Sequence, residues 1–271
     1  MRNIYGTIGY TLLEHKNGKN KIIVLADMHN TLPKCDNKIN MAEWFKSKFN
    51  KSEIFLEEVP RENFELKELW TESEHTQELK NLYLNNMKII SALDIRPFMI
   101  PFSWEVVDTS DNYKITLKRY MKLINEFFCI REPYLKSKLS NYNKEKLTNT
   151  LLGKHFLKLK KKFYNFVKNN RKLLETMIYD IKNSNIMILE EINIMLNSIM
   201  EWYICAKIEV KKHRPIIIHA GLYHSDKVIN WLSTLYGYNI IKQQGVNTME
   251  ESTTKPINGC INLDPISESS F

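Results

Sequence analysis

The stretch IIIHAGLYH, residues 216–224, begins as a continuous apolar run and ends with a glycine and a histidine. A short apolar run of this kind predicts a strand buried on both faces, which is typical of a parallel sheet. The residues that follow, up to Gly237, have the spacing of an amphipathic helix. The stretch therefore predicts a strand-to-helix unit, with His219 inside the strand and His224 at the start of the helix.

Further strands are predicted in the first hundred residues. Residues 4–15 and 21–27 flank Asn17-Gly18, the strongest short-range signal for a β-hairpin turn. The segments SEIFLEEVP (52–60) and IISALDIRPFMIPF (89–102) each read as a strand ended by proline. Helices are predicted between these strands, over about 38–49 and 64–87, and a final strand is predicted over 238–244.

A long helical block separates these segments. Residues 113–212 contain almost no glycine or proline, and Phe156, Leu159, Phe163 and Phe166 recur at helical spacing. A second series of this kind runs from Leu189 to Ala206, and the loop between the two helices is predicted at 183–185. Residues 112–212 carry 21 basic against 9 acidic residues, whereas the rest of the chain carries 18 against 22.

These patterns predict an α/β protein with a mostly parallel sheet, an N-terminal β-hairpin and a large helical insertion. The expected α/β core is 1–111 with 213–245, the basic insertion or cap is 112–212, and an irregular tail is 246–271. The chain has 271 residues, enough to bury a substantial core.

Composition narrows the class of protein. No run approaches 18 consecutive apolar residues, and the first residues lack an apolar signal-peptide core, so we expect an intracellular protein. The four cysteines contain no C-x-x-C pair. Their spacing supports neither a zinc knuckle nor a compact disulfide framework, and it suits a reducing compartment.

Titratable side chains follow each predicted strand of the core, and strand ends are where open α/β sheets bind ligands. They are Asp27 and His29, Glu57 and Glu58, Asp94 and Arg96, and His219 with His224. Each of these residues could instead serve only to stabilise the fold. Asp27 and His29 could cap a loop, Asp94 and Arg96 could form an ion pair, and His219 could be a core histidine bonded to backbone. Since strand residues alternate, one of Glu57 and Glu58 is expected to face solvent.

The segments LADMH (25–29) and AGLYH (220–224) both place a histidine just after a buried strand. Here the chain resembles the TIKI/TraB group of proteins and, more distantly, erythromycin esterases and ChaN-like proteins. The resemblance covers about 21–60 and 214–242 and not the helical block. It departs from the group's Gly-x-x-His pattern at Ala26. It implies that His29, His224 and either Glu57 or Glu58 meet in one site. TIKI-type members are regarded as metal-dependent peptide hydrolases, esterase relatives use a histidine base, and ChaN-like relatives bind haem.

The resemblance thus implies a hydrolase of peptide or ester bonds that uses a divalent ion such as Mn, Co or Zn. His29, His224 and Asp27 are the expected metal ligands, because imidazoles and a carboxylate can leave one position open for water. Glu57, Glu58 or His219 would move protons, and Arg96 would steady a negative charge. Asp27-Met28-His29 also looks like the first motif of calcineurin-like phosphoesterases, but their remaining motifs are absent from the sequence.

The segment 153–174 is basic and amphipathic. It suits nucleic acid or an anionic membrane, but a lysine-rich solvated face on a core-packing helix is the preferred reading. A small-molecule or peptide substrate is the expected partner. The alternative function is a catalytically inactive binding or scaffold protein with the same fold, which would use this basic face.

Overall fold

The computed structural model describes residues 3–18, 20–30, 32–33, 35–36, 38–60, 73–100, 116–129, 150–175, 186–211 and 213–262. The chain divides into two compact units. The first unit comprises 1–60, 70–94 and 204–271, and the second comprises 61–69 and 95–203. The first unit holds the sheets, and the second is helical.

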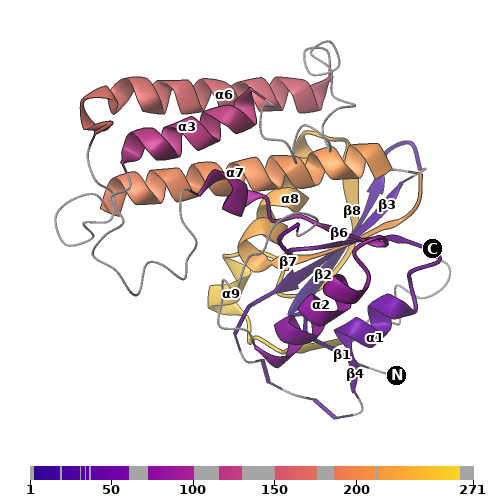
Figure 1. Ribbon diagram of the computed structural model, residues 1–271. Helices are drawn as coiled ribbons and strands as arrows, with labels where there is room; N and C mark the ends of the chain where they lie inside the picture. Colours follow the sequence, from indigo (N-terminus) through magenta and orange to yellow (C-terminus); the bar gives the residue numbers. More distant parts are fainter. Residues whose placement is uncertain are drawn as a thin grey trace. The chain divides into compact units, whose positions relative to one another are not determined.

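The larger sheet has six strands in the order β6-β5-β7-β3-β2-β8 (Figure 1). Their bounds are β6 (Ile90–Ala92), β5 (Glu53–Leu56), β7 (Ile216–Gly221), β3 (Lys21–Asp27), β2 (Gly9–His15) and β8 (Tyr238–Gly245). The four strands from β6 to β3 pair in parallel, and β2 and β8 pair antiparallel at one side. Every residue of β7 is buried, as its continuous apolar sequence predicts. The predicted α/β class with a mostly parallel sheet is confirmed.

The N-terminal hairpin consists of β2 and β3, which pair from Gly9–Ala26 to Glu14–Lys21. Its turn is stabilised by a hydrogen bond of 2.7 Å from the Gly18 N–H to the His15 carbonyl. Gly18 has a φ of 71°, a conformation that glycine adopts without steric cost. Asn17-Gly18 therefore predicted the turn, because glycine readily adopts the backbone conformation that Gly18 has there.

A second, three-stranded sheet has the order β4-β1-β9. β1 (Asn3–Tyr5) pairs in parallel with β4 (Lys38–Asn40) and antiparallel with β9 (Cys260–Asn262). Both β9 and the short helix α9 (Glu251–Thr254) lie in the segment expected to be irregular. Three strand residues are too few to show an alternating pattern in the sequence.

A disulfide joins Cys35, in the loop after β3, to Cys260 in β9. The cysteine spacing, which supports no compact disulfide framework, did not indicate this long-range bond. The two cysteines are 225 residues apart. They come together because β4, which begins shortly after Cys35, and β9 both pair with β1. Cys129 and Cys205, which the structure also describes, are not joined by a disulfide.

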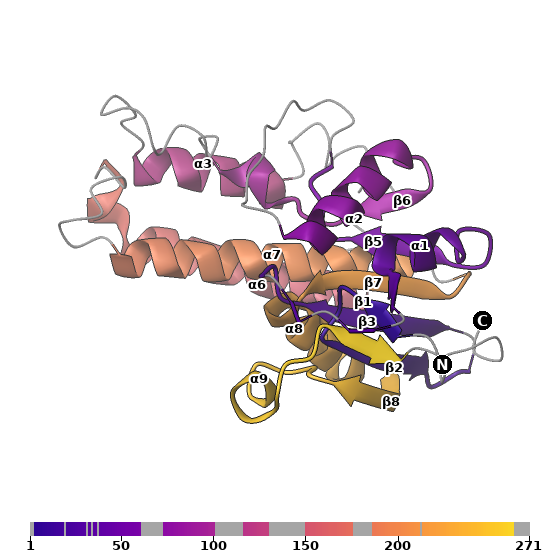
Figure 2. The same cartoon turned by 90° about the horizontal axis from the view of Figure 1, so that it is seen from below.

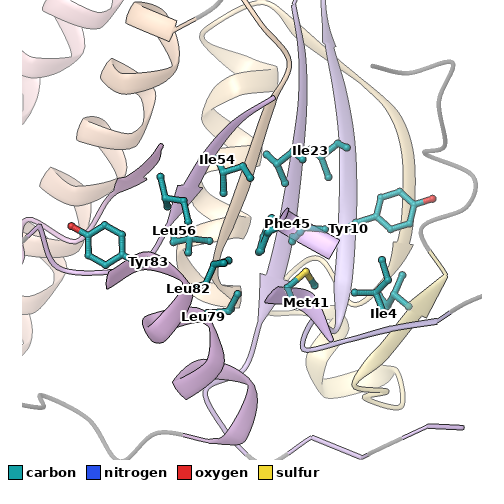
Figure 3. Close-up of a cluster of buried hydrophobic side chains, with 14 of the residues drawn as sticks. Ile4, Tyr10, Ile23, Met41, Phe45, Ile54, Leu56, Leu79, Leu82 and Tyr83 are labelled. Carbon is teal, nitrogen blue, oxygen red and sulfur yellow. The ribbon is translucent and has the colours of Figure 1, made fainter. Parts of the chain in front are cut away.

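Helices cover both faces of the larger sheet. On one face, α1 (Met41–Lys46) and α2 (Glu74–Asn85) pack on alternate residues of the strands (Figures 2 and 3). That cluster includes Ile23, Leu25 and Ile217. On the opposite face α8 (Leu222–Thr234) contacts β3, β7 and β8, and its Leu222 clusters with Ala26.

The second unit has an aromatic core. Its described elements are η1 (Arg96–Met99), α3 (Leu117–Phe128), α6 (Leu151–Asn169), η3 (Arg171–Leu173) and the first part of α7 (Ile186–Lys211). Phe127, Phe128 and Phe156 contact one another, and Trp202 packs on Phe156 at 4.8 Å. The helical spacing of Phe156 and Phe163 is thus confirmed as a buried stripe of α6. The predicted loop at 183–185 lies outside the described residues. None of the described helices is long and apolar enough to cross a membrane.

Candidate functional site

The connections that follow β3 and β7 diverge to opposite faces of the sheet. The chain leaves β3 towards α1 on one face, whereas it leaves β7 towards α8 on the other face. β7 lies between β3 and β5. Adjacent parallel strands whose connections diverge in this way leave a gap outside their ends, where α/β proteins bind ligands.

Three side chains from these neighbouring strand ends meet around the carboxylate of Glu57. His29 follows β3, Glu57 follows β5, and His224 lies in the first turn of α8. The Nε2 atom of His29 lies 3.8 Å from Glu57 Oε2, and Nε2 of His224 lies 3.6 Å from Glu57 Oε1. The side chains of Glu57 and His224 are 8% and 7% exposed, but that of His29 is 53% exposed. His29 is therefore the member of this cluster that a ligand in solution can reach.

Gly221, the last residue of β7, brings its backbone against this cluster. Its N–H donates a hydrogen bond of 2.6 Å to Glu57 Oε2. A Cβ atom at this position would lie 3.1 Å from His29 Nε2 and 3.3 Å from Glu57 Oε2, tighter than most real contacts. Glycine at this position therefore lets His29 and Glu57 pack closely against the backbone.

Asp27 lies behind His29 and is fully buried. Its Oδ2 atom is 3.3 Å from His29 Nδ1, and its Oδ1 atom accepts a hydrogen bond of 2.8 Å from His75 Nε2. Burial alone would raise the pKa of Asp27, but the contacts with His29 and His75 outweigh burial and hold that pKa well below its usual range. Asp27 is therefore a carboxylate at neutral pH.

His29 lies between two carboxylates. Asp27 first and then Glu57 raise the pKa of His29 to about 10, against the smaller opposing effect of burial. At neutral pH the ring is an imidazolium, which can donate a proton. A half-exposed imidazole oriented by a buried carboxylate is a common arrangement for acid–base chemistry.

His219 has the contacts of a structural histidine. Its ring is buried, Nε2 lies 2.9 Å from the carbonyl oxygen of Gly6, and Phe45 packs edge-on against it. Burial lowers the pKa of His219, which favours the neutral ring. These contacts agree with the reading of His219 as a core histidine bonded to backbone rather than as a proton carrier.

The other sequence-predicted residues have different surroundings. Glu57, rather than Glu58, supplies the carboxylate contacts with the histidines. The Glu58 carbonyl accepts a hydrogen bond from the N–H of Asp94, which is buried. Arg96 belongs to the second unit, where it donates a hydrogen bond of 2.9 Å to Asn197 Oδ1.

His75 contacts Asp27, but the sequence patterns did not predict that it belongs to the site. It lies in the first turn of α2 and shares the buried side of that helix with Leu79 and Leu82. The sequence pattern that could have identified it is a histidine at the start of a helix's apolar stripe, because a buried imidazole requires polar partners.

A metal ion does not fit the side chains as they lie. The described part of the chain contains no group of three or more His, Cys, Asp or Glu arranged to hold one. His29 would also have to lose its proton to become a ligand.

No known protein family, curated protein or solved structure matches the chain. The resemblance to the TIKI/TraB group, which depends on His29, His224 and a glutamate after β5, therefore stays a prediction.

Proposed function

We propose that the protein hydrolyses carboxylic ester or peptide bonds at the cluster formed by His29, Glu57 and His224. The observation that carries this proposal is the meeting of side chains from three neighbouring strand ends around Glu57. It places a half-exposed imidazolium, backed by a buried carboxylate, next to a second carboxylate. Paired acid and base groups at a sheet crevice are typical of hydrolytic sites.

In the proposed reaction Glu57 accepts a proton from a water molecule while the water oxygen attacks the carbonyl carbon of the substrate. The carbonyl oxygen gains negative charge, and the imidazolium of His29 stabilises it. When the C–O or C–N bond breaks, His29 gives its proton to the leaving group and regains one from Glu57. Acid–base catalysis of this type typically contributes about 10²- to 10⁴-fold in rate.

The remaining contacts hold these two groups in place. The Gly221 N–H and His224 each approach one oxygen of Glu57, which fixes the plane of that carboxylate. Asp27 holds the Nδ1 side of His29, so Nε2 faces Glu57. The divalent ion that the resemblance implies stays a prediction, and no step of this reaction uses it.

The test is a screen of fluorogenic acyl esters and peptide amides with wild-type protein, His29→Gln and His213→Gln. His213 is an exposed histidine of the same unit, so it is the matched control. We expect turnover by the wild type and His213→Gln, and a loss of about 100-fold or more in His29→Gln. Equal turnover by His29→Gln would contradict the proposal. An inert wild type would favour the binding-protein alternative.

A further inference from the structure

We infer that His75 is a positioning residue of this site: it holds the Asp27 carboxylate so that the second carboxylate oxygen faces His29. This inference depends on the proposed function for its consequence in catalysis. The positions of His75, Asp27 and His29 relative to one another do not depend on that function.

The contacts form a chain that leads from a helix cap to the candidate site. Ser73 Oγ lies 2.9 Å from His75 Nδ1, and His75 Nε2 lies 2.8 Å from Asp27 Oδ1. The other oxygen, Oδ2, lies 3.3 Å from His29 Nδ1. Each carboxylate oxygen of Asp27 thus approaches a different histidine, one buried and one half-exposed.

The hydrogen bonds also determine which nitrogen of His75 carries the proton. An ionised carboxylate only accepts, so Nε2 must be the donor towards Asp27. On the other side of the ring, Ser73 Oγ lies 2.9 Å from His75 Nδ1 and 3.1 Å from Thr76 Oγ1. Ser73 therefore holds the Nδ1 side of the ring while Nε2 faces Asp27.

Packing prevents the His75 ring from turning away. Its side chain is 1% exposed, and the ring of Tyr5 packs against it edge-on at 5.8 Å. A Cβ atom at Gly6 would lie 3.2 Å from the Cβ of His75. Gly6 has a φ of 110°, so glycine is favoured there on conformational grounds as well.

Stability alone is a weak reason for such an arrangement. Buried charged networks are often no more stable than apolar residues of similar volume, and this end of α2 borders an apolar cluster that includes Leu79 and Leu82. Residues that orient the catalytic or ligating group from behind typically change activity by about 10- to 100-fold when removed. A positioning role gives this buried network a function.

The test compares three variants with the wild type. His75→Leu removes the donor to Asp27 and keeps an apolar side chain in the cavity. His75→Gln keeps an N–H group near the position of Nε2. Leu79→Ala, on the buried side of the same helix, is the control for a loss of stability without a change in the network.

Two readouts are needed, one of which does not require a substrate. The ring N–H signals of ¹⁵N-labelled protein report the His29–Asp27 contact. We expect the Nδ1–H signal of His29 to shift or disappear in His75→Leu, to be retained in His75→Gln, and to be unchanged in Leu79→Ala. For hydrolysis we expect kcat to fall about 10- to 100-fold in His75→Leu at unchanged KM, with partial recovery in His75→Gln.

The outcomes separate this inference from the proposed function. A folded His75→Leu protein with an unchanged His29 signal would overturn the positioning role, whatever the activity. A shifted signal together with a wild type that hydrolyses nothing would support the positioning of His29 and reject hydrolysis. If Leu79→Ala changes the His29 signal as much as His75→Leu does, the effect is one of stability and the inference is wrong.

Discussion

Removal of the disulfide between Cys35 and Cys260 is expected to have the largest effect on stability. The bond joins residues 225 apart and links the loop that follows His29 to β9. In the chain-entropy description, a cross-link that closes so long a loop stabilises the folded state by about 5 kcal/mol. Measured values are commonly about 2 to 4 kcal/mol, because structure persists in the unfolded chain.

The perturbation is the double variant Cys35→Ser/Cys260→Ser, studied by urea unfolding and followed by tryptophan fluorescence. With an m-value of about 3 kcal/mol/M, a loss of this size lowers the urea midpoint by roughly 1 M or more. Wild-type protein treated with a dithiol reductant should unfold at a similar midpoint. Cys129→Ser, which changes a free cysteine of the second unit, is the control and should change the midpoint much less.

A thiol count accompanies this experiment. Denatured, non-reduced protein should show two reactive thiols, from Cys129 and Cys205. Four thiols, or oxidised and reduced proteins that unfold at the same urea concentration, would refute the reasoning.

Three further predictions concern the site. Because the pKa of His29 is raised from 6.5 to about 10, its contribution to stability is fully present below pH 6.5 and is lost as the pH rises through 10; melting temperatures across this range should fall more steeply for the wild type than for His29→Gln. Gly221→Ala should lower kcat by about 10-fold or more with little change in melting temperature, since its Cβ would press on His29 and Glu57; an unchanged kcat would show that the crevice has spare room. Asp27→Asn should remove the charge that holds His29 and lower kcat by about 10²-fold or more, and full activity would show that Asp27 acts only in the fold.

The sheet could be predicted because its signals are local. The apolar run of β7 and the Asn-Gly turn of the hairpin each depend on a few adjacent residues. β9 and the Cys35–Cys260 disulfide could not, because they depend on contacts between the two ends of the chain. Such contacts leave no periodic pattern in either segment.

The same distinction applies to the candidate site. Residues that follow parallel strands lie at one edge of the sheet, so the strand pattern predicted that His29, the two glutamates and His224 lie at that edge. The resemblance, not the strand pattern, implied that His29, His224 and one glutamate meet in one site. The choice between Glu57 and Glu58 depends on how the chain turns after β5, which alternation alone does not decide. His75 comes from a helix and not from a strand end, and only three-dimensional packing shows that it reaches Asp27.

The most direct test of the proposed site compares kcat/KM of Glu57→Gln and Glu58→Gln on a substrate that the wild type hydrolyses. The two glutamates are adjacent in sequence, so the pair controls for charge and for local unfolding. We expect Glu57→Gln to lose about 10²-fold or more, because glutamine cannot accept the proton of water. Glu58→Gln should stay close to the wild type. A fully active Glu57→Gln variant, or a loss confined to Glu58→Gln, would contradict the assignment of catalysis to the cluster of His29, Glu57 and His224.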